Sequence, residues 1–277
     1  MLDITVIVPV YQVNDKLKEY YGRALSSVPS DNPELSVLIV GPKAVIKEYE
    51  GVATEYQGRI SFVENEKSDF ATQINVGVKN CGTEFFSILE VDDAYTPIWF
   101  KNAKEHIEAY PNVSVFIPVA EVDDVSGEKP VPVGLANEIA LSSVFADESV
   151  SSDGSSNIGH ISINSLMDHS DFNVTGSVFK TKDFIEVGGL KSTIKMTFWF
   201  EFLLRMLYRG HGVYVVPKIG YIHSLGREGS LMLECEKMDK EEAEHWFEVA
   251  KQEYFFKEER QKPYENHRRK PTTSVVG

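Results

Sequence analysis

The first 119 residues alternate short apolar, β-branched runs with segments of helical periodicity. Residues 4–10 are apolar at nearly every position, as expected of a strand that helices cover on both faces. Pro9 cannot donate to a strand ladder, so pairing is expected to stop near it. Apolar residues at positions 17, 20, 21, 24, 25 and 28 then share one helical face. Short connections between such units predict an α/β fold with a mainly parallel, doubly wound sheet.

The alternation continues along the chain and resumes after an irregular stretch. We expect one domain over residues 1–230, followed by a C-terminal helix capped by Asp239 and a tail. Further strands are predicted at 35–40, 60–63, 85–89, 113–119, 213–216 and 219–223, and further helices at 44–56, 69–79, 97–110, 181–187 and 198–207. In such sheets, ligands bind outside the carboxyl ends of the strands, so the site is expected at that edge.

Residues 120–172 interrupt the pattern. Serine, aspartate and glycine gather there, above all at 149–156, and the stretch carries no recognisable motif. A loop this long inside a compact chain usually has a function or is mobile. We interpret it as a variable insertion of the kind that forms a lid, and not as a separate domain.

The composition is that of a compact globular protein. Hydrophobic residues make up 42% of the chain, which excludes a disordered protein, and two cysteines are too few for a disulfide framework. The start of the chain lacks the basic segment of a signal peptide, and no apolar run reaches the roughly 20 residues of a membrane span. These features predict a soluble, cytoplasmic protein.

The net charge of the chain restricts the classes of binding partner. The 28 basic residues against 42 acidic ones give a formal net charge of −14, which disfavours nonspecific binding to nucleic acid. The C-terminal tail is the exception, since basic residues gather between positions 262 and 270. This tail is either a solvated terminus or an arm that contacts a phosphate-bearing acceptor, such as nucleic acid, or a membrane surface.

Three carboxylates lie within four residues directly after the predicted strand at 85–89. Glu90, Asp92 and Asp93 repel one another unless a positive charge lies among them. Oxygen ligands at a strand end suit Mg²⁺ or Mn²⁺, especially an ion shared with phosphate oxygens. The alternative is that these acids only end the strand and form a turn.

Other candidate residues are predicted near the same edge. Tyr11 follows the first strand, where its ring can stack on a nucleotide base or simply pack. Asn75 and Gly77 share a predicted helix, and a glycine inside a helix costs up to about 1 kcal/mol relative to alanine, so another backbone is expected to approach Gly77. His223 and Arg227 follow a strand near the end of the chain and together suit a diphosphate.

Four blocks of the sequence resemble the family-2 glycosyltransferases with the GT-A fold. Residues 4–11 are similar to the opening strand of that family, and Asn75-x-Gly77 with residues 82–93 resembles its helix, strand and DxD segment. Residues 175–190 resemble the second half of the fold, and residues 204–217 resemble the acceptor-side helix and the strand after it. The order and spacing of the blocks carry the resemblance.

The resemblance implies transfer of a sugar from a nucleotide-diphosphate donor, most simply a UDP-sugar, to an acceptor hydroxyl with inversion. It implies Mn²⁺ or Mg²⁺ on the leaving diphosphate, donor binding by residues 1–119 and acceptor binding by residues 173–230. The implied metal ligands are Asp92, Asp93 and His223, and the implied donor contacts are Pro9, Tyr11, Asn75, Glu90, Asp92, Thr175, Gly176 and Arg227.

Two positions depart from the family pattern. After its second strand the family usually has an acid that reads uracil, but this chain has Gly41-Pro42, so the base is held differently or is not uracil. The family's general base belongs to a Glu-Asp pair at the head of the buried helix, where residues 197–200 contain no acid. Glu201 is the first acid there. It is the predicted base if it faces the cleft, and only an ion pair if it contacts Arg205 at i+4.

Three functions remain open. The first is an active metal-dependent glycosyltransferase, whose acceptor is a glycan, another small or polymeric hydroxyl compound, or a hydroxylated base in DNA. The second is a non-catalytic protein that binds nucleotide sugars or glycans, which the missing Glu-Asp pair suggests. The third, a nucleotidyltransferase, is disfavoured because residues 11–15 are not a glycine-rich basic loop. The retained acids and His223 favour the first.

Overall fold

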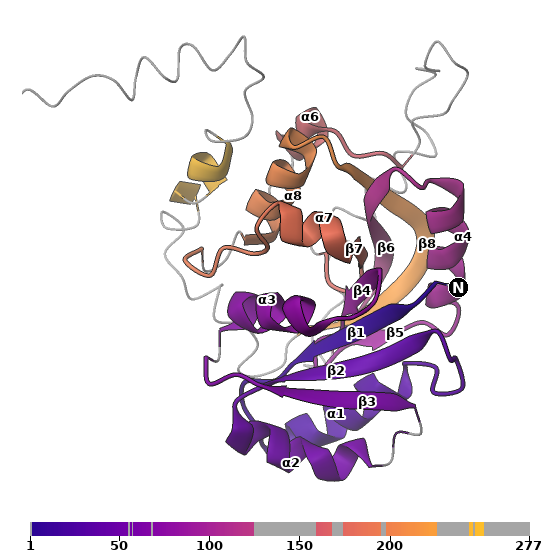
Figure 1. Ribbon diagram of the computed structural model, residues 1–277, viewed down its shortest axis with the longest axis vertical. Helices are drawn as coiled ribbons and strands as arrows, with labels where there is room; N and C mark the ends of the chain where they lie inside the picture. Colours follow the sequence, from indigo (N-terminus) through magenta and orange to yellow (C-terminus); the bar gives the residue numbers. More distant parts are fainter. Residues whose placement is uncertain are drawn as a thin grey trace, which may run out of the picture.

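The computed structural model shows an α/β fold in which helices lie on both sides of one sheet (Figure 1). It describes residues 2–54, 56, 58–67, 69–124, 159–167, 174–194, 198–225, 244–245 and 247–251. The sheet has eight strands in the order β3-β2-β1-β4-β7-β6-β8-β5. These strands are β1 (Ile4–Pro9), β2 (Leu35–Gly41), β3 (Arg59–Glu64), β4 (Phe85–Ile88), β5 (Ala94–Tyr95), β6 (Val113–Asp124), β7 (Val178–Lys180) and β8 (Gly212–Leu225).

The helices begin where the sequence supplies caps or prolines. Asn14 accepts a hydrogen bond from the Leu17 backbone N–H, and Asp69 accepts one from that of Thr72, at the starts of two of them. The helices are α1 (Asp15–Ser26), α2 (Lys43–Ala53), α3 (Phe70–Asn80), α4 (Trp99–Ala109), α6 (Ile163–Met167), α7 (Thr181–Glu186) and α8 (Phe198–Tyr208).

The predicted fold class is confirmed, and its first half is parallel as expected. β1 pairs in parallel with β2 and β4, and β2 pairs in parallel with β3. The second half is more mixed, because the short β7 lies antiparallel between β4 and β6, and β5 lies antiparallel to β8. The two strands predicted at 213–216 and 219–223 are one strand, β8, whose register with β6 shifts near Pro118 and Val119. A bulge there explains the break in the sequence pattern.

The insertion predicted at 120–172 is in part an extension of the sheet. β6 continues to Asp124, five residues beyond its predicted end at Val119. At the other end of the insertion, His160 forms a bridge with Tyr214, and α6 follows. The stretch between these two parts lies outside the described residues.

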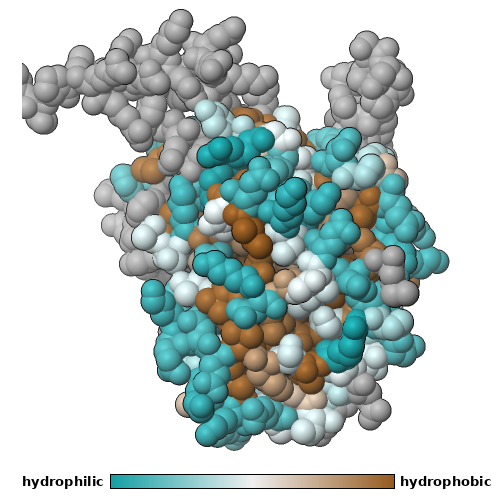
Figure 2. All heavy atoms as spheres, viewed as in Figure 1, coloured by the Kyte–Doolittle hydropathy of each residue, from teal (hydrophilic) through white to brown (hydrophobic). Residues whose placement is uncertain are grey.

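Two hydrophobic clusters fill the space on either side of the sheet. One packs α3, α7 and α8 against the strands and contains Ile7, and the other packs α1, α2 and α4 and contains Val6 and Val8. Successive residues of β1 therefore enter opposite layers. Figure 2 shows hydrophobic side chains in the middle of one face, over α3 and the strands beside it. Among the described helices, none is both long and apolar enough to cross a bilayer.

Candidate functional site

An acidic turn follows β4 at the carboxyl edge of the parallel strands. We use the name acidic turn for residues 90–93, which lead from β4 into β5. β5 pairs with β8, so that Ala94 lies opposite Ile222 and Tyr95 opposite Tyr221. This pairing brings the end of β8, more than 120 residues away in sequence, beside the turn.

Asp93 connects the acidic turn to β8 through both of its carboxylate oxygens. It is 1% exposed. Oδ1 accepts a hydrogen bond of 2.8 Å from the Ser224 backbone N–H, and Oδ2 lies 3.0 Å from His223 Nδ1. Asp93 is therefore engaged in orienting β8 and its histidine.

His223 has one ring nitrogen in that contact and one without a partner. Its Nε2 is buried and has no hydrogen-bond partner among the residues that the structure describes. Burial lowers the pKa of His223, but the nearby carboxylates, chiefly Asp93, outweigh burial and raise the pKa to about 9. A histidine that gives one nitrogen to a carboxylate and keeps the other for a further partner has the arrangement of a metal ligand.

Arg23 of α1 also contacts the acidic turn. Its Nη2 donates to the Asp92 carbonyl at 2.8 Å and to Ser224 Oγ at 2.6 Å, and Ser224 Oγ donates to the same carbonyl at 2.7 Å. Its Nη1 lies 3.3 Å from Asp123 Oδ2. Arg23 therefore brings a positive charge to the backbone of the acidic turn, and its ion pair is with Asp123. The sequence analysis missed it, because no local signal connects residues 69 positions apart.

The described residues contain no preassembled group of three or more histidine, cysteine or acidic side chains that would hold a metal ion. Both oxygens of Asp93 are engaged with β8, which accounts for part of this result. The buried Nε2 of His223 and the 5% exposed Asp92 are nevertheless suited to a divalent ion, because they add a nitrogen ligand to an oxygen ligand. The fit of this site to a metal ion rests on these two side chains.

The predicted sugar-side turn lies next to β4. Thr175 is 4% exposed, and the Gly176 N–H donates to the Ile88 carbonyl at 3.0 Å. Gly176 has φ +79°, and a Cβ there would lie 2.3 Å from the Tyr221 ring. Tyr221 was not predicted, and its contact with Gly176 is visible only in the folded chain. Pro9 is buried at the end of β1, and Tyr11 is partly exposed just beyond it.

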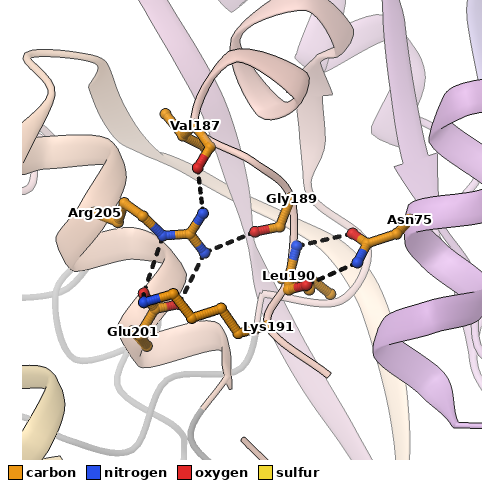
Figure 3. A network of polar contacts seen from close by, with 7 residues as sticks. All are labelled: Asn75, Val187, Gly189, Leu190, Lys191, Glu201 and Arg205. Carbon is orange, nitrogen blue, oxygen red and sulfur yellow. Dashed lines mark hydrogen bonds and ion pairs between the residues drawn. The ribbon is translucent and has the colours of Figure 1, made fainter. Parts of the chain in front are cut away.

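Asn75 of α3 bonds to the backbone of Leu190 (Figure 3). Its Nδ2 donates to the Leu190 carbonyl at 2.7 Å, and its Oδ1 accepts from the Leu190 N–H at 2.8 Å. Gly189 has φ +68°, and a Cβ there would lie 2.4 Å from Asn75 Oδ1. The expected role of Asn75 in donor binding therefore receives no support from its contacts. Gly77 is closely approached, as expected, but by the side chains of Ile7 and Val40.

Glu201 forms the ion pair that the sequence analysis offered as the alternative to a base. It is 1% exposed, and Arg205 donates to both of its oxygens, at 3.0 Å from Nε and 2.8 Å from Nη2. Lys191 Nζ lies 2.8 Å from Oε1. Arg205 also donates to the Val187 and Gly189 carbonyls, so the pair holds the turn before α8 (Figure 3). These contacts count against the prediction that Glu201 is the general base.

The head of α8 carries aromatic side chains instead of acids. Phe198 and Trp199 are 9% and 7% exposed, and both contact Phe70 of α3, with ring centroids 5.6 and 6.3 Å apart. The structure thus brings the acidic turn, His223 and the turn at Thr175 together, and it assigns Asn75 and Glu201 to a second network. Arg227, the basic tail and most of the insertion lie outside the described residues.

Comparison with known proteins agrees with the fold. A family model described as Glycosyl transferase family 2 matches residues 5–169. Uncharacterized glycosyltransferases of Rickettsia felis and Rickettsia prowazekii are 33% and 31% identical over 94 residues, or 34% of this chain. The matched parts are 15% and 28% of the length of those two proteins.

Solved structures resemble the chain over most of its length. TarS of S. aureus in complex with UDP-GlcNAc gives a TM-score of 0.57 at 18% identity, over 84% of this chain and 61% of TarS. The mannosyltransferase PcManGT of Pyrobaculum calidifontis in complex with GDP-Man and Mn²⁺ gives 0.56 at 14% identity, over 82% of this chain and 58% of PcManGT. At these identities the likeness establishes the fold.

Proposed function

The chain belongs to glycosyl transferase family 2, and on that premise we propose that it transfers a sugar from a nucleotide-diphosphate donor to an acceptor hydroxyl, with inversion and with a divalent ion. The observation that carries the proposal is the buried Nε2 of His223, which has no partner among the described residues, on a ring that Asp93 orients beside the acidic turn. Two proteins of similar fold were solved with nucleotide sugars, one of them with Mn²⁺. Those complexes support the donor class and the ion.

We assign the ion to the Asp92 carboxylate and His223 Nε2, with Asp93 holding the histidine. When bound, the ion would offset the negative charge that grows on the leaving diphosphate. Arg23 keeps the Asp92 carbonyl in place. Asp93 thus moves from the expected ligand set to a supporting role, because both of its oxygens are already engaged.

The remaining donor contacts are assigned from their place at the edge of the sheet. Glu90 follows β4 and is suited to the ribose hydroxyls, while Pro9 ends β1 and Tyr11 lies just beyond it, where both are suited to the base. The turn at Thr175 and Gly176 forms the floor for the sugar, beside the end of β4. Residues from β1, β4 and the second half of the chain would then surround one donor molecule.

A second function is favoured by the surroundings of Glu201. The expected base is engaged with Arg205 and Lys191, and the head of α8 carries Phe198 and Trp199. A protein of this kind would bind a nucleotide sugar without transferring it. Turnover therefore distinguishes the two functions, and binding alone does not.

The test is thermal unfolding of the protein against UDP, GDP, ADP and their sugars, with and without Mn²⁺. A ligand at 100 times its Kd adds about 2.7 kcal/mol to the free energy of unfolding. We expect a shift with one nucleotide that needs Mn²⁺ and is lost in Asp92→Asn. No shift with any nucleotide would contradict the proposal.

The acceptor is then sought with the sugar donors of the nucleotide that gives this shift. Release of the nucleoside diphosphate is measured with oligosaccharides and with DNA that carries hydroxymethylated bases. Release that depends on one acceptor supports transfer, and binding without release from any donor supports the non-catalytic alternative.

A further inference from the structure

Tyr221 of β8 contacts several parts of the candidate site and is absent from the predicted donor contacts. Its side chain is 0% exposed. Its hydroxyl oxygen accepts a hydrogen bond of 3.2 Å from the Glu90 backbone N–H. Its ring lies against Gly176, where a Cβ would come within 2.3 Å of it. One side chain therefore touches the acidic turn and the turn at Thr175, which are 85 residues apart in sequence.

The Tyr221 ring sets the position of the turn at Thr175 and Gly176. Gly176 adopts φ +79°, a conformation that favours glycine, and its N–H bonds to the Ile88 carbonyl at the end of β4. Since any larger residue would collide with the Tyr221 ring, the backbone of the turn rests directly on it. The Tyr95 ring packs edge-on against the Tyr221 ring, with the ring centroids 5.5 Å apart.

The hydroxyl fixes the start of the acidic turn. The hydroxyl oxygen accepts from the backbone N–H of Glu90, the first residue of the acidic turn. The neighbouring Tyr95 differs, because its hydroxyl bonds to Ser87 and the Ile88 carbonyl.

We propose that Tyr221 is a positioning residue for donor binding, which sets the distance between the Glu90 backbone and the sugar-side turn at Thr175 and Gly176. It does not touch the donor. Its ring holds one turn and its hydroxyl holds the other, so the ribose-side and sugar-side contacts keep one spacing. This role rests on the proposed function, since it is defined by the nucleotide-sugar donor.

The variant Tyr221→Phe removes the hydroxyl and keeps the ring. We expect the Kd for the nucleoside diphosphate that shifts the wild type, measured by calorimetry with Mn²⁺, to rise about fivefold to tenfold, in line with one lost hydrogen bond. Tyr95→Phe is the matched control, because it removes a buried hydroxyl from the adjacent ring without touching Glu90. We expect its Kd to stay within about twofold, whatever its melting temperature.

Two further measurements separate positioning from folding. Gly176→Ala forces the turn away from the ring and is expected to weaken binding of the matching nucleotide sugar at least as much as Tyr221→Phe does, with circular dichroism reporting whether it folds. An unchanged Kd in Tyr221→Phe, or an equal rise in Tyr95→Phe, would overturn the role of Tyr221 alone. A wild type that binds no nucleotide would overturn the proposed function, and the role of Tyr221 with it.

Discussion

Two groups of acidic side chains in the described part of the chain differ in the cations around them. Glu201 is one negative charge that contacts two positive ones, Arg205 and Lys191. The acidic turn has three carboxylates, with His223 and Arg23 as its cationic neighbours. In the contacts described, the first group has two cations for one acid, whereas the second has two cations for three acids. The two groups are therefore expected to respond differently when a charge is removed.

The strongest test of this comparison is to remove a cation from the first group, which is Glu201 with Arg205 and Lys191. Arg205→Ala leaves Glu201 buried at 1% exposure and removes the bonds that hold Val187 and Gly189. We expect a loss of about 3–5 kcal/mol in the free energy of unfolding, typical of a broken buried ion pair. Denaturant titration measures it.

Arg209→Ala is the matched control, because Arg209 is exposed just after the same helix. Its effect should stay within about 0.5 kcal/mol. A small loss in Arg205→Ala would show that Lys191 alone neutralises Glu201.

Removal of a charged side chain from the second group, the acidic turn, should have the opposite effect on stability. Asp92→Ala removes a carboxylate from a group with excess negative charge, so we expect unchanged or higher stability in metal-free buffer. Turnover of donor should fall about 10²-fold to 10³-fold, because the ion loses a ligand.

Asp123→Ala is the control for that variant, since Asp123 is an acid near the same edge whose side chain is 49% exposed. Its turnover should change little. If Asp92→Ala keeps wild-type turnover in chelator-treated protein with added Mn²⁺, the metal assignment is wrong.

Asn75 sharpens the comparison, because it was expected at the donor but its contacts lie in the network of Glu201. Asn75→Ala removes two hydrogen bonds to the Leu190 backbone, so we expect a loss of about 2 kcal/mol in stability and an unchanged nucleotide Kd. Asn80→Ala is the control on the same helix, because Asn80 makes only an exposed bond to the Val76 carbonyl among the contacts described. A raised Kd with unchanged stability would return Asn75 to the donor contacts.

The smallest effect is expected at the solvent side of the first group. The Lys191 side chain is 36% exposed, and Lys191→Ala should cost less than about 1 kcal/mol, since solvent screens such pairs. Salt titration checks this, because the difference from wild type should shrink as ionic strength rises. A loss as large as that of Arg205→Ala would mean that both cations are needed.

The sequence predicted the parallel half of the fold because its signals are local. Apolar strands, helical faces and short connections are all readable within a few residues, and the caps that the structure shows at Asn14 and Asp69 are equally local. The antiparallel β7 and the single long β8 were not predicted, since short strands have weak patterns and their pairing depends on distant partners.

The residues of the candidate site also divide into those with a local sequence signal and those whose contacts depend on distant partners. The acidic turn was found from its composition, and the possible pairing of Glu201 with Arg205 was visible from the i+4 spacing. Arg23 and Tyr221 were missed, because each acts on a backbone group 69 or 131 residues away. No property of an isolated arginine or tyrosine marks it for such a contact.

The most direct test compares Mn²⁺ binding by the wild type, His223→Gln and Glu201→Gln in calorimetry, with the nucleoside diphosphate present and folding checked by circular dichroism. If the acidic turn and His223 hold the ion, His223→Gln should weaken Mn²⁺ binding about 10-fold to 100-fold. Glu201→Gln should leave it within about twofold, because Glu201 is already neutralised by Arg205 and Lys191. Equal Mn²⁺ affinity in the wild type and His223→Gln, or a loss confined to Glu201→Gln, would contradict the assignment of the acidic turn as the metal and donor site.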